Sequence, residues 1–168
     1  HARHLTTAFL KGYLARSLGS EVNEVSASSV ARDRGIKIDE PLRDEHRSFQ
    51  SLLQFSIEGP DGTETIAGTV FGKQSLRIVR LTETNLDAIP EGWMLILKNR
   101  DLPGVVGRLG TALGLAGVNI ANMSLGRDRD RGLATCVMNL DSEPAASIID
   151  SLRRLPEVAR VHLVNAEA

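Results

Sequence analysis

The run DLPGVVGRLGTALGLAGVNI, residues 101–120, carries glycine often enough to suggest a phosphate-binding loop. Such a loop follows a strand and offers backbone N–H groups that an anion can approach closely. The dinucleotide fingerprint requires G-x-G-x-x-G and an acidic residue about 20 positions further on, whereas this run reads G-x-x-G-x-x-G. The chain also contains no G-x-x-x-x-G-K-[ST] sequence. The spacing therefore argues against a nucleotide site.

The glycines of this run fall into two groups on the helix predicted for residues 103–116. One group shares a flank of the helix, within an arc of roughly 80° when successive residues are about 100° apart: Gly107, Gly110, Gly114 and Gly117. Since an interior glycine costs about 0.5–1 kcal/mol relative to alanine, this flank favours a close neighbour, either inside the domain or in another subunit. Gly104 lies in the first turn after Pro103, where the missing Cβ lets a small anion such as a carboxylate reach unpaired amides. Asp101 either caps this helix or pairs with a ligand ammonium group.

Other reactive residue types are too scattered to predict catalysis. His1 and His4 lie one helical turn apart, whereas His46 and His162 are isolated, so we expect no metal site. Cys136 lies within a predicted strand, without a histidine near it in sequence, and is predicted to be a buried structural thiol. A single thiol cannot form an internal disulfide, a four-thiolate zinc site or an iron–sulfur cluster within the chain. A single cysteine fits a reducing, cytoplasmic setting.

The composition argues against several classes of partner. The 168 residues carry a formal net charge of -1, with acidic and basic residues interspersed, so we expect neither nucleic acid nor a membrane as partner. No apolar run approaches the roughly 18 residues that span a bilayer. The chain begins at His1 rather than at methionine, and we interpret it as a fragment of a longer protein.

The first third of the chain predicts one helix and several short elements. Apolar residues at helical spacing predict a helix over residues 5–18, ended by Gly19. Residues 22–27 and 36–41 are predicted as short strands. Between them we expect one or two helical turns that end at Gly35.

A hairpin and a domain boundary follow. The sequence GPDG at residues 59–62 lies between two β-runs and predicts a hairpin tip, and residues 75–83 predict a further strand. A proline and a glycine then interrupt the pattern at residues 89–92. We therefore expect one domain at 1–90 and a second at 91–168.

The second half predicts alternating strands and helices. Strands are expected at 93–99, 118–126, 132–140 and 158–164, and helices at 103–116 and 144–155. The order β-α-β-β-α-β is that of the ferredoxin-like fold, in which two helices cover one face of a four-stranded antiparallel sheet. The expected fold class is α+β: a small mixed α/β domain followed by a ferredoxin-like βαββαβ domain.

Two parts of the chain resemble known modules. The stretch NRDLPGVVGRLGTALGLAGVNIANMSLGRDRDRGLATCVMNLD resembles an ACT domain, a ferredoxin-like module that binds amino acids between paired copies, through its D-x-P-G turn and its G-V-N-I sequence. LKGYLARSLGSEVNEVSASSVARDRGI and AGTVFGKQSLRIVRL are similar to the intervening regulatory domain of long-form D-3-phosphoglycerate dehydrogenase. Together the resemblance covers nearly the whole chain.

The resemblance implies a division of labour within a longer parent protein. The parent's substrate and Rossmann domains, which are not in these residues, would oxidise 3-phosphoglycerate with NAD in L-serine biosynthesis. This chain alone would be no enzyme and would hold no cofactor, but would bind L-serine or a related amino acid and form a homo-oligomer through its ACT domain. The family's intervening domain has a strand before its first helix that this chain lacks, so we expect an exposed sheet edge or one completed by a neighbour.

The resemblance also implies an effector site shared by two copies. The first strand-to-helix loop of one copy and the asparagine of G-V-N-I in the other would hold the amino acid; by position these are Asn99, Asp101, Pro103, Gly104, Val105, Asn119 and Ile120. Some relatives have histidine and asparagine in place of Asn99 and Asp101, which changes the charge near the ligand's amino group. Asn119 has a local alternative, since asparagine near a strand start often bonds only nearby backbone.

A second anion site is the weaker implication. Some relatives are proposed to bind a phosphorylated, substrate-like anion through basic residues of the intervening domain. Arg77 matches one of these, with Lys73 nearby, but Asn85 and Ile89 replace a histidine and an arginine. We therefore interpret Arg77, Lys73 and Arg80 as a solvated or interface face.

Two alternative functions stay open. The chain could be the small subunit of a bacterial iron–sulfur L-serine dehydratase that takes its cluster cysteines from another chain, although the match of the first half argues against this. It could also be a purely structural oligomerisation module that has lost effector binding.

Overall fold

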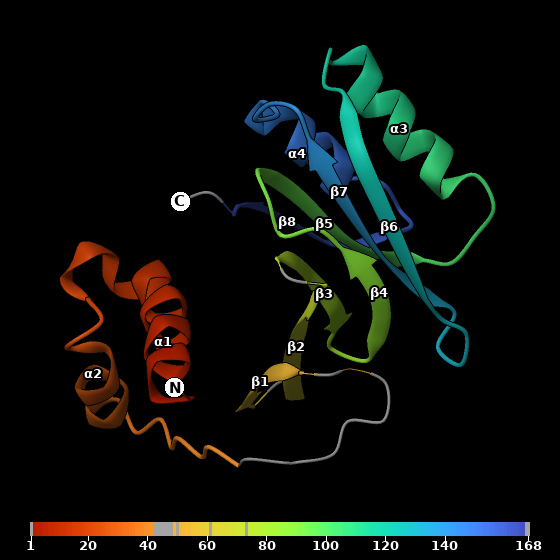
Figure 1. Cartoon of the computed structure of the whole chain (residues 1–168). Helices are drawn as coiled ribbons and strands as arrows, with labels where there is room; N and C mark the ends of the chain where they lie inside the picture. The colour runs from red at the N-terminus through yellow and green to blue at the C-terminus, as the bar shows by residue number, and fades with distance from the viewer. Residues whose placement is uncertain (1, 42–48, 50, 61, 73, 167–168) are drawn as a thin grey trace. The chain divides into compact units, whose positions relative to one another are not determined.

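The computed structural model describes residues 2–41, 49, 51–60, 62–72 and 74–166 (Figure 1). The chain divides into two compact units, His1–Glu45 and His46–Ala168. Within the described residues the first unit is helical, and the second contains two four-stranded antiparallel sheets and two helices. The fold class is α+β, as predicted.

The first unit is built on the helix that the apolar spacing predicted. It begins with α1 (Ala2–Leu18), followed by the 3-10 turn η1 (Gly19–Glu21) and α2 (Ala27–Asp33). Leu10 and Leu14 of α1 are buried against α2. This small core holds the unit together, because both helices bury one apolar face in it.

The strands predicted at residues 22–27 and 36–41 are wrong. The side-chain Oδ1 of Asn23 accepts hydrogen bonds from the backbone N–H groups of Val25 and Ser26, each at 2.9 Å. These bonds close a local turn that leads into α2, and they compete with the extended conformation that the apolar residues suggested. Residues 36–41 have no strand partner within the described part of the chain.

The first sheet of the second unit is an antiparallel meander. It comprises β1 (Leu53–Gly59), β2 (Gly62–Phe71), β3 (Ser75–Leu81) and β4 (Thr84–Ala88), in that spatial order. Gly59 pairs with Gly62 across the predicted hairpin tip. The sequence did not predict β4. Leu81 pairs with Thr84 across its turn, in which Thr82 has a φ of 51°, and this turn contains no glycine, proline or asparagine to mark it.

The second sheet and its helices form the predicted ferredoxin-like βαββαβ fold. Along the chain it comprises β5 (Trp93–Arg100), α3 (Val105–Leu115), β6 (Ile120–Asp128), β7 (Leu133–Leu140), α4 (Ala146–Arg153) and β8 (Val158–Asn165). The spatial strand order is β6-β7-β5-β8, with antiparallel neighbours. Both helices lie on one face of this sheet (Figure 1). The core between helices and sheet includes the fully buried side chains of Leu95, Leu97, Leu109, Leu113 and Leu152.

The helix-free face of this second sheet packs against the β3–β4 hairpin. Met94 and Val137 are buried there together with Ala88 of β4. The backbones of β4 and β6 approach each other closely at Gly126, where a Cβ atom would lie 2.4 Å from the carbonyl oxygen of Asn85. Because that neighbour is backbone, a larger residue at position 126 requires the strands to move apart.

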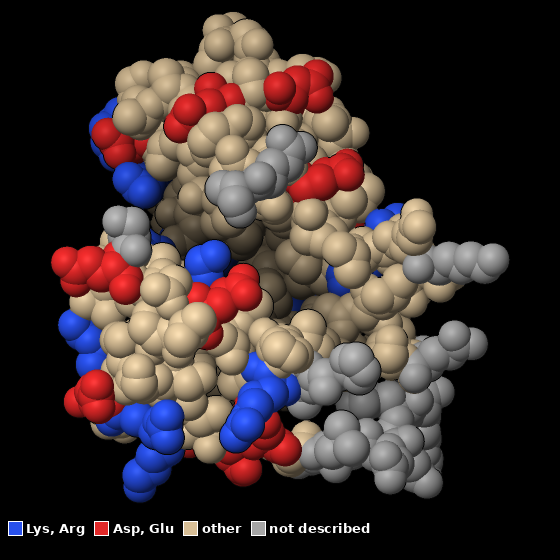
Figure 2. Space-filling model, turned by 60° about the vertical axis from the view of Figure 1, so that its left-hand side comes forward, with Lys and Arg blue, Asp and Glu red and all other residues tan. Residues whose placement is uncertain are grey.

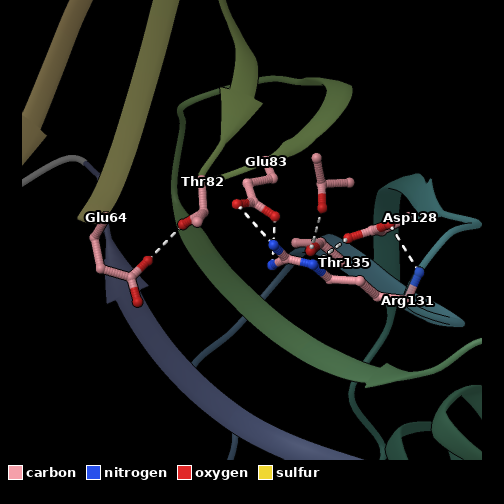
Figure 3. Close-up of polar contacts among 7 residues, drawn as sticks. Glu64, Thr82, Glu83, Asp128, Arg131 and Thr135 are labelled. Atoms are coloured by element: carbon pink, nitrogen blue, oxygen red, sulfur yellow. Dashed lines mark hydrogen bonds and ion pairs between the residues drawn. The ribbon is translucent and has the colours of Figure 1, made fainter. Parts of the chain in front are cut away.

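Polar side chains link the same two sheets (Figure 3). Arg131, at the end of the β6–β7 turn, donates a hydrogen bond to Glu83 at 3.0 Å and approaches Asp128 at 3.8 Å. The hydroxyl oxygens of Thr84 and Thr135 lie 3.3 Å apart. We call this set of contacts, together with the apolar packing around Ala88 and Gly126, the sheet junction.

Two further contacts of the sheet junction involve the ends of the strands. The side-chain amide of Asn139 donates to the carbonyl oxygens of Ile89 at 3.0 Å and Glu91 at 2.8 Å. Asn139 therefore holds the segment in which we placed the domain boundary, and the division at 1–90 and 91–168 stays a prediction.

Glu64 of β2 forms another link. Its carboxylate accepts hydrogen bonds from the hydroxyl of Thr82 and, at 3.0 Å, from Arg160 of β8. The Thr82 hydroxyl and then the Arg160 guanidinium hold the pKa of the Glu64 carboxyl below its usual value, against the opposing effect of burial.

Candidate functional site

The β5–α3 loop brings most of the predicted effector residues to one corner of the second sheet. The backbone N–H of Asp101 donates to the carbonyl of Gly132 at 2.9 Å. Gly104 has a φ of 83° and occupies the N-cap position of α3, one residue before the helical turn in which we expected it. Glycine suits this position because a side chain disfavours positive φ. The corner thus collects Asn99, Asp101, Pro103, Gly104 and Val105.

Asp101 does not cap the helix, so that interpretation is wrong. α3 has no side-chain hydrogen bond at its N-cap. The Oδ2 atom of Asp101 instead lies 2.6 Å from Nε of Arg127 on β6. The pairing neutralises the carboxylate that we considered for a ligand ammonium group. No sequence pattern indicated this pair, because the partners are 26 residues apart.

Asn99 is buried on the helix-covered side of the sheet, with 3% of its surface exposed. Its Nδ2 donates to the carbonyl oxygen of Arg100 at 2.8 Å. Its Oδ1 is buried without a hydrogen-bond partner in the protein. A buried acceptor left unpaired costs about 1–3 kcal/mol, so this oxygen is a candidate for a ligand contact.

Asn119 and Ile120 lie at the other end of α3. Asn119 is exposed and donates from Nδ2 to Oδ2 of Asp141 at 2.6 Å. α3 has 11 residues, so at about 1.5 Å per residue it separates these positions from the loop by roughly 16 Å. The structure therefore places the predicted effector residues in two groups within one copy of the chain.

The glycine flank of α3 has no neighbour among the described residues of the second unit. A Cβ atom built on Gly107, Gly110 or Gly114 meets no atom within 4 Å. The interpretation that the flank packs tightly inside the domain is therefore wrong. Gly117 lies beyond the helix end, where its φ of 72° suits a C-terminal cap.

The predicted second anion site is only partly described. Arg77 forms an ion pair with Asp87 at 3.1 Å and donates to the hydroxyl of Ser75 at 2.8 Å. These contacts use Nε and Nη1 of its guanidinium. Lys73 lies outside the described residues, and the site stays an untested prediction. Acidic and basic side chains are interspersed on the face that Figure 2 shows.

Other chemistry is limited in the described part of the chain. No group of three or more His, Cys, Asp or Glu side chains there is placed to hold a metal ion. None of its helices has the length and apolar character needed to cross a membrane. Cys136 is fully buried in the core, as predicted, and burial raises the pKa of its thiol to about 11 from an ordinary 9.0.

The buried thiol gives a pH prediction. Because the fold favours the neutral thiol, the free energy of unfolding should be unaffected below about pH 8 and should fall as the pH rises from about 9 towards 11, by up to about 3 kcal/mol. Urea unfolding of the wild type and of Cys136→Ala at about pH 7, 9 and 10.5 measures this pH dependence, because the fall is expected between the ordinary and the raised pKa of the thiol. The difference in stability between the two proteins should shrink at high pH, and a constant difference would contradict the assignment.

Two family models match the chain in succession. The model described as the D-3-phosphoglycerate dehydrogenase intervening domain matches residues 1–82, and the ACT domain model matches residues 93–157. The chain fits the C-terminal regulatory part of D-3-phosphoglycerate dehydrogenase. β4 lies between the two matched ranges.

Relatives named D-3-phosphoglycerate dehydrogenase align along nearly the whole chain. The Bacillus subtilis protein is 31% identical over 161 residues, 96% of this chain and 31% of the relative. The Archaeoglobus fulgidus protein is 35% identical over 153 residues, 90% of this chain and 29% of the relative. The Synechocystis protein is 29% identical over 164 residues, 98% of this chain and 30% of the relative. The chain thus spans less than a third of the length of these relatives.

Proposed function

We propose that this chain is the amino-acid-sensing part of an NAD-dependent D-3-phosphoglycerate dehydrogenase that acts in cytoplasmic L-serine biosynthesis. It binds L-serine or a related amino acid between two paired ACT domains. Domains outside this chain would bind NAD and the phosphorylated substrate. The regulatory part alone would not catalyse the reaction.

The observation that carries this proposal is the separation of the two predicted effector groups. The loop with Gly104 lies at one end of α3, and the exposed Asn119 lies at the other end. The 11 residues of the helix separate them by roughly 16 Å. An amino acid is too small to contact both ends of the helix in one copy. A two-fold axis beside the helix brings one end of α3 in the first copy near the opposite end in the second.

The edge of the second sheet supplies a surface for this pairing. β6 is an edge strand, and its Met123 and Leu125 are 41% and 40% exposed. They pair with Met138 and Cys136, whose side chains belong to the helix-side core, so all four face the same side. An exposed edge with apolar side chains favours association with another strand. The open glycine flank of α3 lets a second helix come close on that side.

Calorimetry tests the proposal. Titration of the 168-residue chain with L-serine should show saturable binding, and Asn119→Ala should weaken it at least about tenfold, since a lost hydrogen bond to a charged ligand costs about 1.5–3 kcal/mol. Asn85→Ala is the matched control, because this exposed side chain accepts a hydrogen bond from Arg80 and lies on the first sheet, away from α3. A stable oligomer that binds no amino acid would instead support a structural oligomerisation module.

A further inference from the structure

Two buried side-chain oxygens of the described residues have no hydrogen-bond partner in the protein. They are Oδ1 of Asn99 and Oε2 of Glu157. Buried polar atoms are nearly always paired, so each exception requires a physical reason. Glu157 lies just before β8 and was not among the residues predicted for the effector site.

These two residues are neighbours at the same corner of the second sheet. Asn99 pairs with Val158 across β5 and β8, and the backbone N–H of Arg100 donates to the carbonyl of Glu157 at 2.8 Å. Neighbouring strands lie only about 4.8 Å apart. The corner also contains the start of α3, where the first backbone N–H groups have no acceptor within the helix.

Arg108 adds a positive charge to this corner. Its Nη2 lies 2.8 Å from Oε1 of Glu157, and its Nη1 would lie 3.3 Å from a Cβ on Gly104. The guanidinium therefore extends over the loop glycine from the first turn of α3. It binds one carboxylate oxygen of Glu157 and leaves the other as a free acceptor.

Glu157 is thus the acidic group with an unpaired oxygen at this corner. The carboxylate of Asp101 already pairs with Arg127 at 2.6 Å. The Nδ2 atom of Asn99 donates a hydrogen bond to the carbonyl oxygen of Arg100, and the Oδ1 atom stays available as an acceptor. Two acceptors close to a guanidinium and a helix N-terminus match a ligand that carries both an ammonium group and a carboxylate.

We propose that Glu157 and Asn99 accept hydrogen bonds from the α-ammonium group of the amino-acid effector, while Arg108 and the N-terminus of α3 hold its carboxylate. This assignment rests on the proposed function and deepens it, because it gives Glu157 the role that the sequence suggested for Asp101. It makes a free ammonium group a requirement for binding. A ligand without that group leaves both oxygens unpaired.

The test uses the whole chain and calorimetric titration with L-serine. Glu157→Gln keeps the size of the side chain and an oxygen for Arg108 but removes the negative charge. It should weaken the binding of L-serine at least about tenfold. Glu143→Gln removes an exposed charge from the β7–α4 connection and should leave the affinity unchanged. Equal affinities of the wild type and Glu157→Gln would overturn the assignment but leave the proposed function intact. A wild type that binds no amino acid would overturn both.

A second titration requires no variant. N-acetyl-L-serine keeps the hydroxyl and the carboxylate but lacks the ammonium group, so the wild type should bind it at least about tenfold more weakly than L-serine. Equal binding of the two ligands would show that the two buried oxygens serve only the folded protein, and would overturn the assignment.

Discussion

Alanine in place of Gly126 should destabilise the second unit by about 3 kcal/mol. Its Cβ would lie 2.4 Å from the backbone oxygen of Asn85 and 2.4 Å from Cγ2 of Thr84. Overpacking of this kind typically costs about 1–3 kcal/mol, and the upper end applies because a backbone atom cannot rotate out of the way. Urea unfolding followed by circular dichroism measures the change.

The same substitution at Gly12 provides the control. A Cβ atom on this exposed glycine in the interior of α1 would meet no neighbouring atom within 4 Å, so alanine there should stabilise the protein by about 0.5–1 kcal/mol. The two variants make the same chemical change with opposite expected signs. Equal effects would show that β4 and β6 are not in close contact at the sheet junction.

A fragment of residues 93–168 should lose several kcal/mol of stability relative to one of residues 51–168. Without the β3–β4 hairpin, Met94 and Val137 on the helix-free face become exposed, although they are 2% and 0% exposed in the chain. Burial of one large apolar side chain contributes about 1.5–3 kcal/mol, and a domain has only about 5–15 kcal/mol in total. We expect a lower urea midpoint and self-association of the shorter fragment on gel filtration.

Equal urea midpoints for the two fragments would contradict this expectation. They would show that the ACT domain is stable alone and that the first sheet only rests against it. A boundary near residues 89–92 would then also separate two stability units. A lower midpoint would place the first sheet and the ACT domain in one folding unit, consistent with the contacts of Asn139.

Sequence patterns predicted the second unit better than the first. The alternation of apolar residues predicted all four strands of the ACT sheet, because each strand packs one face against the helices. Such patterns failed at residues 22–27, where a side chain of Asn23 replaces the strand partner. β4 was missed because its turn lacks glycine and proline.

The sequence indicated where the residues of the candidate site lie in the fold, but not which charged side chains form ion pairs there. The loop and Asn119 could be placed from the D-x-P-G and G-V-N-I sequences alone. The ion pairs of Asp101 with Arg127 and of Arg108 with Glu157 join residues 26 and 49 positions apart. Only the fold brings such partners together, so the charge available to a ligand could not be worked out from the sequence.

Sedimentation equilibrium measures whether two copies of this chain share an amino acid at their ACT domains, as we propose. If the ligand bridges two copies, linkage requires that L-serine lower the dissociation constant of the dimer. We predict a clear shift towards the dimer when L-serine is added to the wild type, and a much smaller shift for Asn119→Ala. A dimer constant that does not respond to L-serine or to any related amino acid would contradict the claim.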